Sequence, residues 1–340
     1  MTSPRVPSEL PLSDGPHRGP FWAYLRVTSL QLQPGEITQA LGVEPDESHG
    51  IGEADPDSLG TYKWSVWSRY LVLDDAVPWG TEALTAAIEA LGGGLADRLG
   101  ELARTSCEVS LMVVQELYED CDSGLFLTAA AVDWLARAGA RVDVDQRVFG
   151  PEERDMAAHP GPAEVLIPFD RPTVSLVPFG WPTMTPFLPF APLSDGPDRG
   201  PFWAYVRVTS LQIQPHEITQ ALGVEPDESH DIGNTNPYSL RAYKWSMWSK
   251  YLVLDDAVPL GTEAFTAAIE ALGGELADRL GELARTSCEV SLMVVQELDE
   301  ESDSGIHLTP AAIGWLARAG AYLDIDQYVL LGLGPDEDDE

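Results

Sequence analysis

The feature that most constrains this chain is that one long segment occurs twice. Residues 12–147 return without a gap as residues 193–328, and the two copies are identical at 108 of 136 aligned positions. A unit of this length is near the common domain size and can bury a core of its own. Its period is far longer than the roughly 20–50 residues of a solenoid repeat. We therefore predict two self-sufficient folded units in one chain.

The limits of the repeat define the expected segments. Residues 1–11 are rich in proline and serine, which predicts a disordered lead-in, and residues 12–149 form the first repeat domain. Residues 150–192 are a proline-rich linker with many aromatic residues, so this segment is either an extended spacer or docks along a domain. Residues 193–331 form the second domain, and residues 332–340 form an acidic tail.

Hydrophobic periodicity predicts the elements of each unit. In the first copy it predicts strands at 21–28, 62–68, 107–117, 125–127 and 141–148, and helices at 34–41, 81–102 and 128–138. Gly92, Gly93 and Gly94 should kink the long helix, and less so in the second copy, where Glu275 replaces Gly94. The two strands before the last helix are expected to form a hairpin. The order strand, helix, strand, helix, hairpin, helix, strand predicts an α+β fold, with helices on one face of a mostly antiparallel sheet.

The chain is strongly acidic, with a formal net charge of −35. Proteins that bind nucleic acids need Lys and Arg to neutralise phosphates, so we expect no nucleic-acid partner. The acidic charge either keeps the protein soluble and monomeric or attracts a basic protein partner through its field. Adaptation to high salt is a further explanation of such a composition.

Cysteine usage and hydropathy bear on the compartment. The three cysteines, Cys107, Cys121 and Cys288, make neither a disulfide framework nor a CxxC motif, which fits a reducing cytoplasm. No run reaches about 18 apolar residues and no signal-peptide pattern opens the chain, so we expect no membrane association. Cys107 and Cys288 begin a buried strand, which favours packed thiols over nucleophiles.

The first candidate site is an acidic loop that carries one histidine in each copy. Its residues are Glu44, Asp46, Glu47 and His49 in the first copy, and Glu225, Asp227, Glu228 and His230 in the second. Carboxylates with an imidazole are possible metal ligands. However, the spacing matches no calcium or zinc motif, and the second copy replaces Glu53 and Asp55 with asparagines. We expect a solvated loop with no metal and no cofactor.

The second candidate site is an aromatic and basic set on the first two strands. Trp22, Tyr24 and Arg26 share one face of the first strand, while Lys63 and Trp67 share a face of the second. With Trp64 and the second-copy equivalents, the set continues with Trp203, Tyr205, Arg207, Lys244, Trp245 and Trp248. If the helices cover the other face, these residues form a binding platform, because Trp, Tyr and Arg dominate binding hot spots. The alternative is that the linker, a loop or the sister domain buries them.

The sequence predicts no catalytic residues. It contains no GxSxG, HExxH or phosphate-loop motif, and among six histidines only His49 and His230 occupy the same position in both copies. Whether the protein is an enzyme is left open, with a negative answer favoured. An uncharacterised hydrolase is the least favoured of the hypotheses.

Several short motifs are similar to a known family. They are Glu36 to Thr38, Leu41 to Asp46, Gly52-Glu53, Trp64-Ser65, Leu127-Thr128, Trp134 to Ala136 and Val142 to Asp145, with Ile325 to Tyr328 in the second copy. They resemble the bacterial domain of unknown function 4279 (DUF4279), over nearly all of each copy. Arg147 and Asn234 depart from the pattern. The resemblance implies a fold but no agreed activity, and small acidic bacterial domains of this kind are suspected of being immunity proteins against toxins.

Three functions follow as hypotheses. The favoured one is a non-enzymatic protein whose tandem acidic domains engage a protein partner, with immunity-type neutralisation of a basic toxin as the specific form. The alternative is a small-ligand or metal-binding module centred on residues 44–67 and 225–248. The third is the hydrolase. In each case we expect a monomer with two pseudo-equivalent domains.

Overall fold

The computed structural model describes residues 21–55, 60–73, 81–118, 123–149, 202–236, 240–254, 262–298 and 305–329. Within them both copies follow the same order of elements. The first copy contains β1 (Phe21–Ser29), α1 (Pro34–Leu41), β2 (Glu47–His49), β3 (Ser65–Tyr70), α2 (Thr81–Ala90), α3 (Gly93–Thr105), β4 (Cys107–Tyr118), β5 (Ser123–Leu127), α4 (Ala129–Ala138) and β6 (Ala140–Phe149). The second contains β7 (Phe202–Ser210), α6 (Pro215–Leu222), β8 (Glu228–His230), β9 (Ser246–Tyr251), α7 (Thr262–Ala271), α8 (Gly274–Ala284), β10 (Cys288–Leu298), β11 (Ile306–Leu308), α9 (Pro310–Ala319) and β12 (Tyr322–Val329).

Local sequence signals set the ends of α4. The hydroxyl of Thr128 accepts a hydrogen bond from the backbone N–H of Ala131, which caps the helix as its sequence predicts. Gly139 ends the helix in the left-handed conformation, with φ of +62°, where a side chain would be strained. The same two devices recur at Thr309 and Gly320 around α9.

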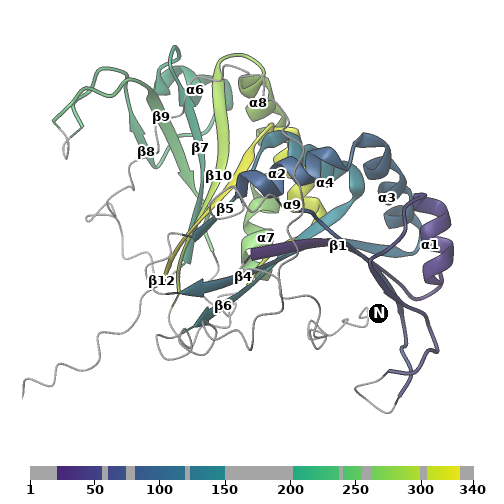
Figure 1. Cartoon of the computed structure of the whole chain (residues 1–340). Coiled ribbons are helices and arrows are strands. Elements are labelled where there is room, and N and C mark those ends of the chain that lie inside the picture. The colour runs from purple at the N-terminus through teal and green to yellow at the C-terminus, as the bar shows by residue number, and fades with distance from the viewer. Residues whose placement is uncertain are drawn as a thin grey trace, which may run out of the picture.

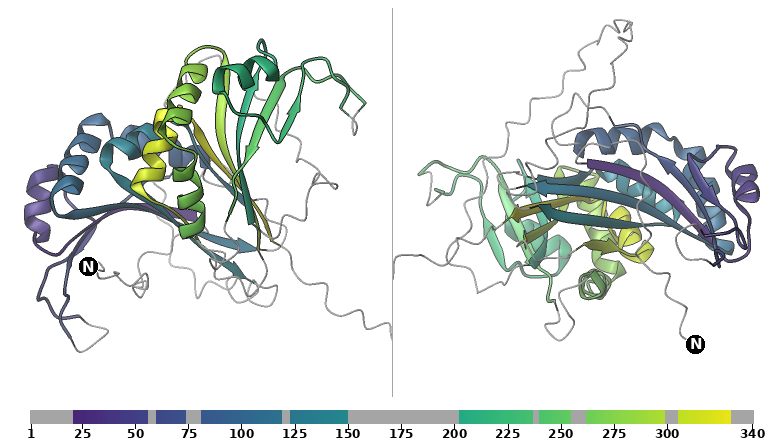
Figure 2. Two further views of the ribbon diagram at one scale, coloured as in Figure 1. Left: turned by 180° about the vertical axis from the view of Figure 1, so that it is seen from behind. Right: turned by 60° about the horizontal axis from the view of Figure 1, so that its bottom comes forward.

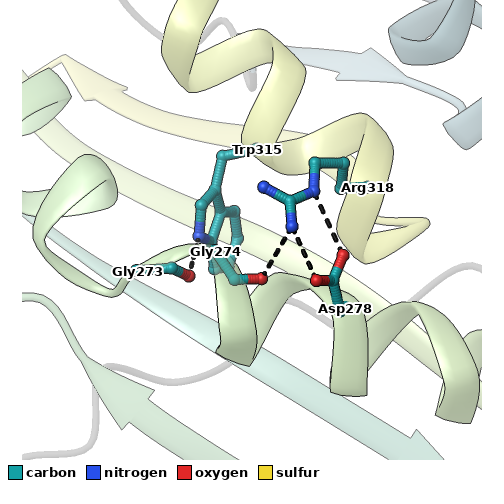
Figure 3. Close-up of polar contacts among 5 residues, drawn as sticks. All are labelled: Gly273, Gly274, Asp278, Trp315 and Arg318. Carbon is teal, nitrogen blue, oxygen red and sulfur yellow. Dashed lines mark hydrogen bonds and ion pairs between the residues drawn. The ribbon is translucent and has the colours of Figure 1, made fainter.

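The long helix predicted over 81–102 is two helices, α2 and α3. The break lies at Gly92, whose φ is +73°, and the equivalent Gly273 has a φ of +78°. The break is therefore not milder in the second copy, because the turning glycine precedes the position where the copies differ. Figure 3 shows how α9 holds this turn: the indole N–H of Trp315 donates to the carbonyl of Gly273 at 2.9 Å. The indole of Trp134 makes the same contact with Gly92 at 3.0 Å.

Each sheet has six strands and is mostly antiparallel, as predicted. The first has the order β11-β6-β4-β1-β3-β2 and the second β5-β12-β10-β7-β9-β8. In each sheet one pair is parallel, β4 with β6 and β10 with β12, and the other pairs are antiparallel. A parallel pair needs a long crossover, which α4 or α9 supplies.

The outer strand next to each parallel pair comes from the other copy. β5 pairs with β12, and β11 pairs with β6. The expected hairpin between β4 and β5 is therefore wrong. β4 already has β1 on one side and β6 on the other, so it offers no free edge to β5. Glycine makes the exchange possible, because a Cβ on Gly124 would lie 2.8 Å from the carbonyl oxygen of Ile325, and one on Gly305 would lie 2.6 Å from that of Val144.

The exchange joins the two copies into one body. The helices lie between the two sheets, as Figures 1 and 2 show, with α4 against α9, α4 also against β12 and α9 also against β6. Buried apolar residues of both copies form a single cluster that includes Leu25, Val27, Val206 and Val208. This differs from the expected pair of self-sufficient units, because each copy completes its sheet with a strand of the other.

Three predicted segments lie outside the described residues: the lead-in 1–11, the linker 150–192 and the tail 332–340. Among the helices that the structure describes, none combines the length and the apolar composition needed to cross a membrane.

Candidate functional site: a buried arginine on the helix-free face of each sheet

Strand alternation divides the residues of β1 between the two faces of the first sheet. Ala23, Leu25 and Val27 point to the helices and are completely or almost completely buried in the core. Residues of opposite parity, among them Tyr24 and Arg26, therefore lie on the face that carries no helix. The right-hand view of Figure 2 looks onto this face.

The strand register assembles a polar row around Arg26. Arg26 is directly opposite Ser68 of β3 and Ser110 of β4. The row continues outward to Glu47 beyond Ser68 and to Arg141 beyond Ser110. Because directly opposed residues share a face, these five side chains lie in one line across the sheet.

An aromatic and acidic row lies beside it. Tyr24 is opposite Tyr70 and Met112, and Asp143 follows Met112 on β6. The rings of Tyr24 and Tyr70 are 5.3 Å apart. Burial raises the pKa of the Tyr24 hydroxyl, which keeps this hydroxyl protonated as a hydrogen-bond donor at neutral pH.

Arg26 is the unusual member of the first row. Its side chain is only 7% exposed, and its Nε and Nη2 atoms find no hydrogen-bond acceptor among the described residues. A buried donor without an acceptor destabilises a folded protein, and a charged one does so more strongly. An unsatisfied group of this kind needs an explanation, and an acceptor supplied by a bound ligand or partner is one.

Arg141 lies in the same row as Arg26, beyond Ser110, and its guanidinium has partners. Its Nε donates to the hydroxyl of Ser110 at 3.0 Å, and it forms an ion pair with Glu108. Burial lowers the pKa of Arg141, and the positive charge of Arg26 acts in the same direction. The two guanidinium groups are thus close enough for their charges to interact.

The second copy repeats this face with one change. Arg207, 6% exposed, takes the place of Arg26, but Tyr322 replaces Arg141 and accepts a hydrogen bond from Arg207 Nη2 at 3.5 Å. Burial lowers the pKa of Arg207, while Tyr322 and Tyr205 outweigh that effect and raise it overall. The guanidinium is therefore held by its own sheet in the second copy.

Two carboxyl groups on the second face are also perturbed. Burial, helped by the neighbouring charge of Asp326, raises the pKa of Asp324 to about 6. Burial likewise raises the pKa of Asp326, and it raises that of Tyr205 to about 12. These groups sit in a region of low dielectric response, where polar contacts are stronger than in water.

A projecting segment flanks each face. In the first copy the ring of His49 stacks on Tyr62 with centroids 3.7 Å apart, and an isolated bridge joins Ala54 to Thr61. Burial lowers the pKa of His49, and Arg26 lowers it further, so His49 is neutral at pH 7 and near enough to Arg26 to interact with it. His230 stacks on Tyr243 in the same way.

The structure corrects the predicted role of two tryptophans. Trp67 and Trp248 are completely buried in the core and belong to no surface platform. Trp67 is opposite Val27 of β1, whose side chain faces the helices, so the pairing register turns this indole inward. The other predicted aromatic and basic residues of this segment do reach the surface in part: Trp64 is half-buried, Trp245 is exposed, and Lys63 and Lys244 are exposed.

The acidic loop ties β2 to β3. Asp46 Oδ2 accepts a hydrogen bond from the backbone N–H of Tyr70 at 2.7 Å, and Asp227 does the same for Tyr251 at 2.8 Å. Glu44 and Glu225 are exposed beside them. Within the described part of the chain, no three His, Cys, Asp or Glu side chains are grouped so that they could hold a metal ion.

Sequence reasoning missed several members of the face, namely Ser68, Ser110, Tyr70, Arg141, Asp143 and Asp145. The alternation of each strand was visible, but only the register shows which residues of different strands meet. One available signal was that most of these positions are identical in the two copies, with Arg141 and Tyr322 as the difference.

The comparisons with known proteins agree with the duplication. The model of a domain of unknown function, DUF4279, matches residues 19–149 and again residues 201–330, which together are well over half of the chain. Neither a curated protein nor a solved structure matches this chain. The chain is therefore a member of the DUF4279 family, and it carries the family's domain twice.

Proposed function

We propose that this protein is a non-enzymatic binding protein that engages a protein partner through the helix-free faces of its two sheets. The observation that carries the proposal is the buried guanidinium of Arg26, which keeps two donor atoms without an acceptor among the described residues. A preformed, desolvated arginine flanked by tyrosines is typical of the hot spots at which partners bind.

The chemistry of the candidate nucleophiles favours binding over turnover. Burial raises the pKa of the Cys107 and Cys288 thiols, and Tyr24 is likewise shifted towards its protonated form. Protonated thiols and phenols are poor nucleophiles at neutral pH. The Tyr24 phenol, on the helix-free face, is suited to donate a hydrogen bond to a partner.

The charge of the chain suggests the kind of partner. A net charge of −35 repels acidic proteins and attracts basic ones, and such steering accelerates association at low salt. A basic protein toxin that is neutralised by tandem acidic domains is the specific form of this proposal. Two faces on one chain also allow both to engage one partner or two copies of it.

The test is retention of a partner from the native host by the purified full-length chain, compared between variants. Trp22→Ala combined with Trp203→Ala removes the half-buried indole at the end of each face. The matched control is Val72→Ala with Val253→Ala, which changes two equivalent residues that are each 90% exposed. We expect the tryptophan variant to lose a basic partner that the control retains, with retention falling steeply as salt is added. Equal retention by both variants would contradict the proposal, and so would retention that ignores salt.

A small-molecule ligand is the second candidate, because the unpaired edge of Arg26 could equally receive a free anion. A thermal shift of the full-length chain on adding a small anion, with no partner retained from the host, would favour this alternative.

A further inference from the structure

The two donor atoms of Arg26 define the shape of the group that would satisfy them. Nε and Nη2 lie on the same edge of the guanidinium, and their N–H bonds point in parallel. Both atoms are covered, and neither has an acceptor among the described residues. Two parallel donors match the two oxygens of a carboxylate in a bidentate pair.

The charged groups around Arg26 favour a ligand with one negative charge over a ligand with two. Arg141 places a second guanidinium near Arg26. On the other side, Asp143 and Asp145 act on Tyr24, and Glu47 ends the row of Arg26. These carboxylates would repel a dianion such as phosphate more strongly than a monoanion.

We propose that the Nε–Nη2 edge of Arg26 binds a carboxylate, which under the proposed function is an acidic side chain or a terminal carboxylate of the protein partner. The ligand pairs with the guanidinium by two charge-assisted hydrogen bonds, and the hydroxyl of Tyr24 lies on the same face as a further donor. Because the edge is covered, the carboxylate reaches it only after neighbouring side chains turn aside, so association is slower than diffusion.

The second copy does not offer the same edge. Arg207 Nη2 already donates to the hydroxyl of Tyr322, which stands where the first copy has Arg141. Of the two described faces, the first therefore carries the carboxylate site, and the second has a similar construction whose arginine is held by a neighbour. This difference supplies the test variant: Arg141→Tyr gives the first face the arrangement of the second.

The experiment observes the arginine directly in the full-length chain. In the ¹⁵N-labelled protein, Arg26→Lys identifies the Nε–Hε signal of Arg26 and Arg207→Lys identifies that of Arg207. Sodium acetate is titrated against acetamide, which has the same shape without the charge, and against inorganic phosphate. Two peptides blocked at both ends, one with a central Glu and one with a central Gln, and a third Gln peptide with a free C-terminal carboxylate, distinguish the sources of the carboxylate.

We expect the Arg26 signal to shift saturably with acetate and with the Glu peptide or the free-carboxylate peptide. Acetamide and the blocked Gln peptide should leave it unchanged, and the Arg207 signal should move little. Arg141→Tyr should weaken acetate binding about tenfold, as expected for the loss of one of two charge-assisted hydrogen bonds. Arg104→Lys makes the same chemical change as Arg26→Lys, but at an exposed position on a helix, and should leave acetate binding unaffected.

Three results would overturn the inference: no response of Arg26 to any carboxylate, a stronger response to phosphate than to acetate, or equal responses of Arg26 and Arg207. The wild-type signal decides these even if a variant folds poorly. The outcomes also separate the two proposals. If Arg26 does not respond to carboxylates but the tryptophan variant loses the partner, the carboxylate site is contradicted and the binding face is supported. If Arg26 responds but the partner is retained after substitution of Trp22 and Trp203, the carboxylate site is supported and the binding face is contradicted.

Discussion

The backbone of Phe126 in the first copy pairs with that of Asp324 in the second, and the ring of Phe126 lies 5.2 Å from the ring of Tyr322. β5 is thus an integral strand of the second sheet. The reciprocal pairing of His307 with Asp143 makes β11 an integral strand of the first. Neither sheet is complete without a strand from the opposite copy, and this relationship governs how the protein should respond to being divided or altered.

A fragment of residues 12–149 should form a homodimer. Alone, it would expose the edge of β6 and leave β5 without a partner strand, but a second copy of the fragment offers both, because Leu125 and Leu127 would meet Val144 and Val142 in place of Ile325 and Leu323. Light scattering after size-exclusion chromatography should give twice the fragment's mass. A monomer that unfolds cooperatively would show instead that one copy is self-sufficient.

Gly124→Ala should destabilise the whole chain. The new Cβ would lie 2.8 Å from the carbonyl oxygen of Ile325 within the exchanged pair, and forcing such a contact costs about 1–3 kcal/mol. Urea unfolding measures the change. Gly35→Ala is the control, since nothing lies within 4 Å of its Cβ and alanine favours a helix, so it should be neutral or slightly stabilising. Equal effects of the two substitutions would mean that the exchanged strand yields easily.

The turn between α7 and α8 allows a buried contact to be compared with an exposed one (Figure 3). Trp315→Phe removes the donor to the Gly273 carbonyl and part of the packing, and we expect a loss of about 1–3 kcal/mol. Asp278→Asn weakens the ion pair with Arg318. The side chains of Asp278 and Arg318 are 61% and 52% exposed, so a loss below about 1 kcal/mol is expected. Chemical denaturation of both variants gives the order, and a larger loss for Asp278→Asn would contradict it.

The carboxyl of Asp324 should make stability depend on pH. Its pKa rises from 3.8 to about 6, so the folded state holds a proton that the unfolded state has released between these values. The free energy of unfolding should therefore fall as pH rises from about 4 to about 6 and then remain lower. Asp324→Asn should reduce this dependence, leaving the contribution of Asp326, and should stabilise the protein at pH 7 by up to about 3 kcal/mol. Glu275→Gln, at a carboxylate that is 80% exposed, is the control. An undiminished pH slope in Asp324→Asn would show that another group holds the proton.

The sequence predicted the elements well because their signals are local. Thr128 and Gly139 mark the ends of α4, and the alternation along β1 separates Leu25 from Arg26. It failed for Trp67, because both faces of β3 carry apolar residues and only pairing with Val27 decides which face meets the helices.

The exchanged strands were beyond sequence reasoning for a related reason. β5 and β11 occupy equivalent places in two copies of nearly the same sequence, so pairing within a copy and pairing across copies bury similar side chains. The enclosure of β4 by β1 and β6 rules out a hairpin between β4 and β5, but the outer edges of β6 and β12 are equivalent, so local sequence signals do not distinguish them. The candidate site was predictable only in part for the same reason. Tyr24 and Arg26 lie on one strand and could be recognised by alternation, whereas Ser110 and Arg141 are placed with them only by the pairing register.

Joining the copies in one polypeptide also frees them from having to be alike. In an assembly of two identical chains, any residue placed beside one central arginine stands beside the other as well. Here a single codon change affects one face alone, which is how position 141 can carry a second cation while position 322 carries a phenol. The strand exchange preserves a shared scaffold, and fusion allows the two faces to carry different residues at equivalent positions.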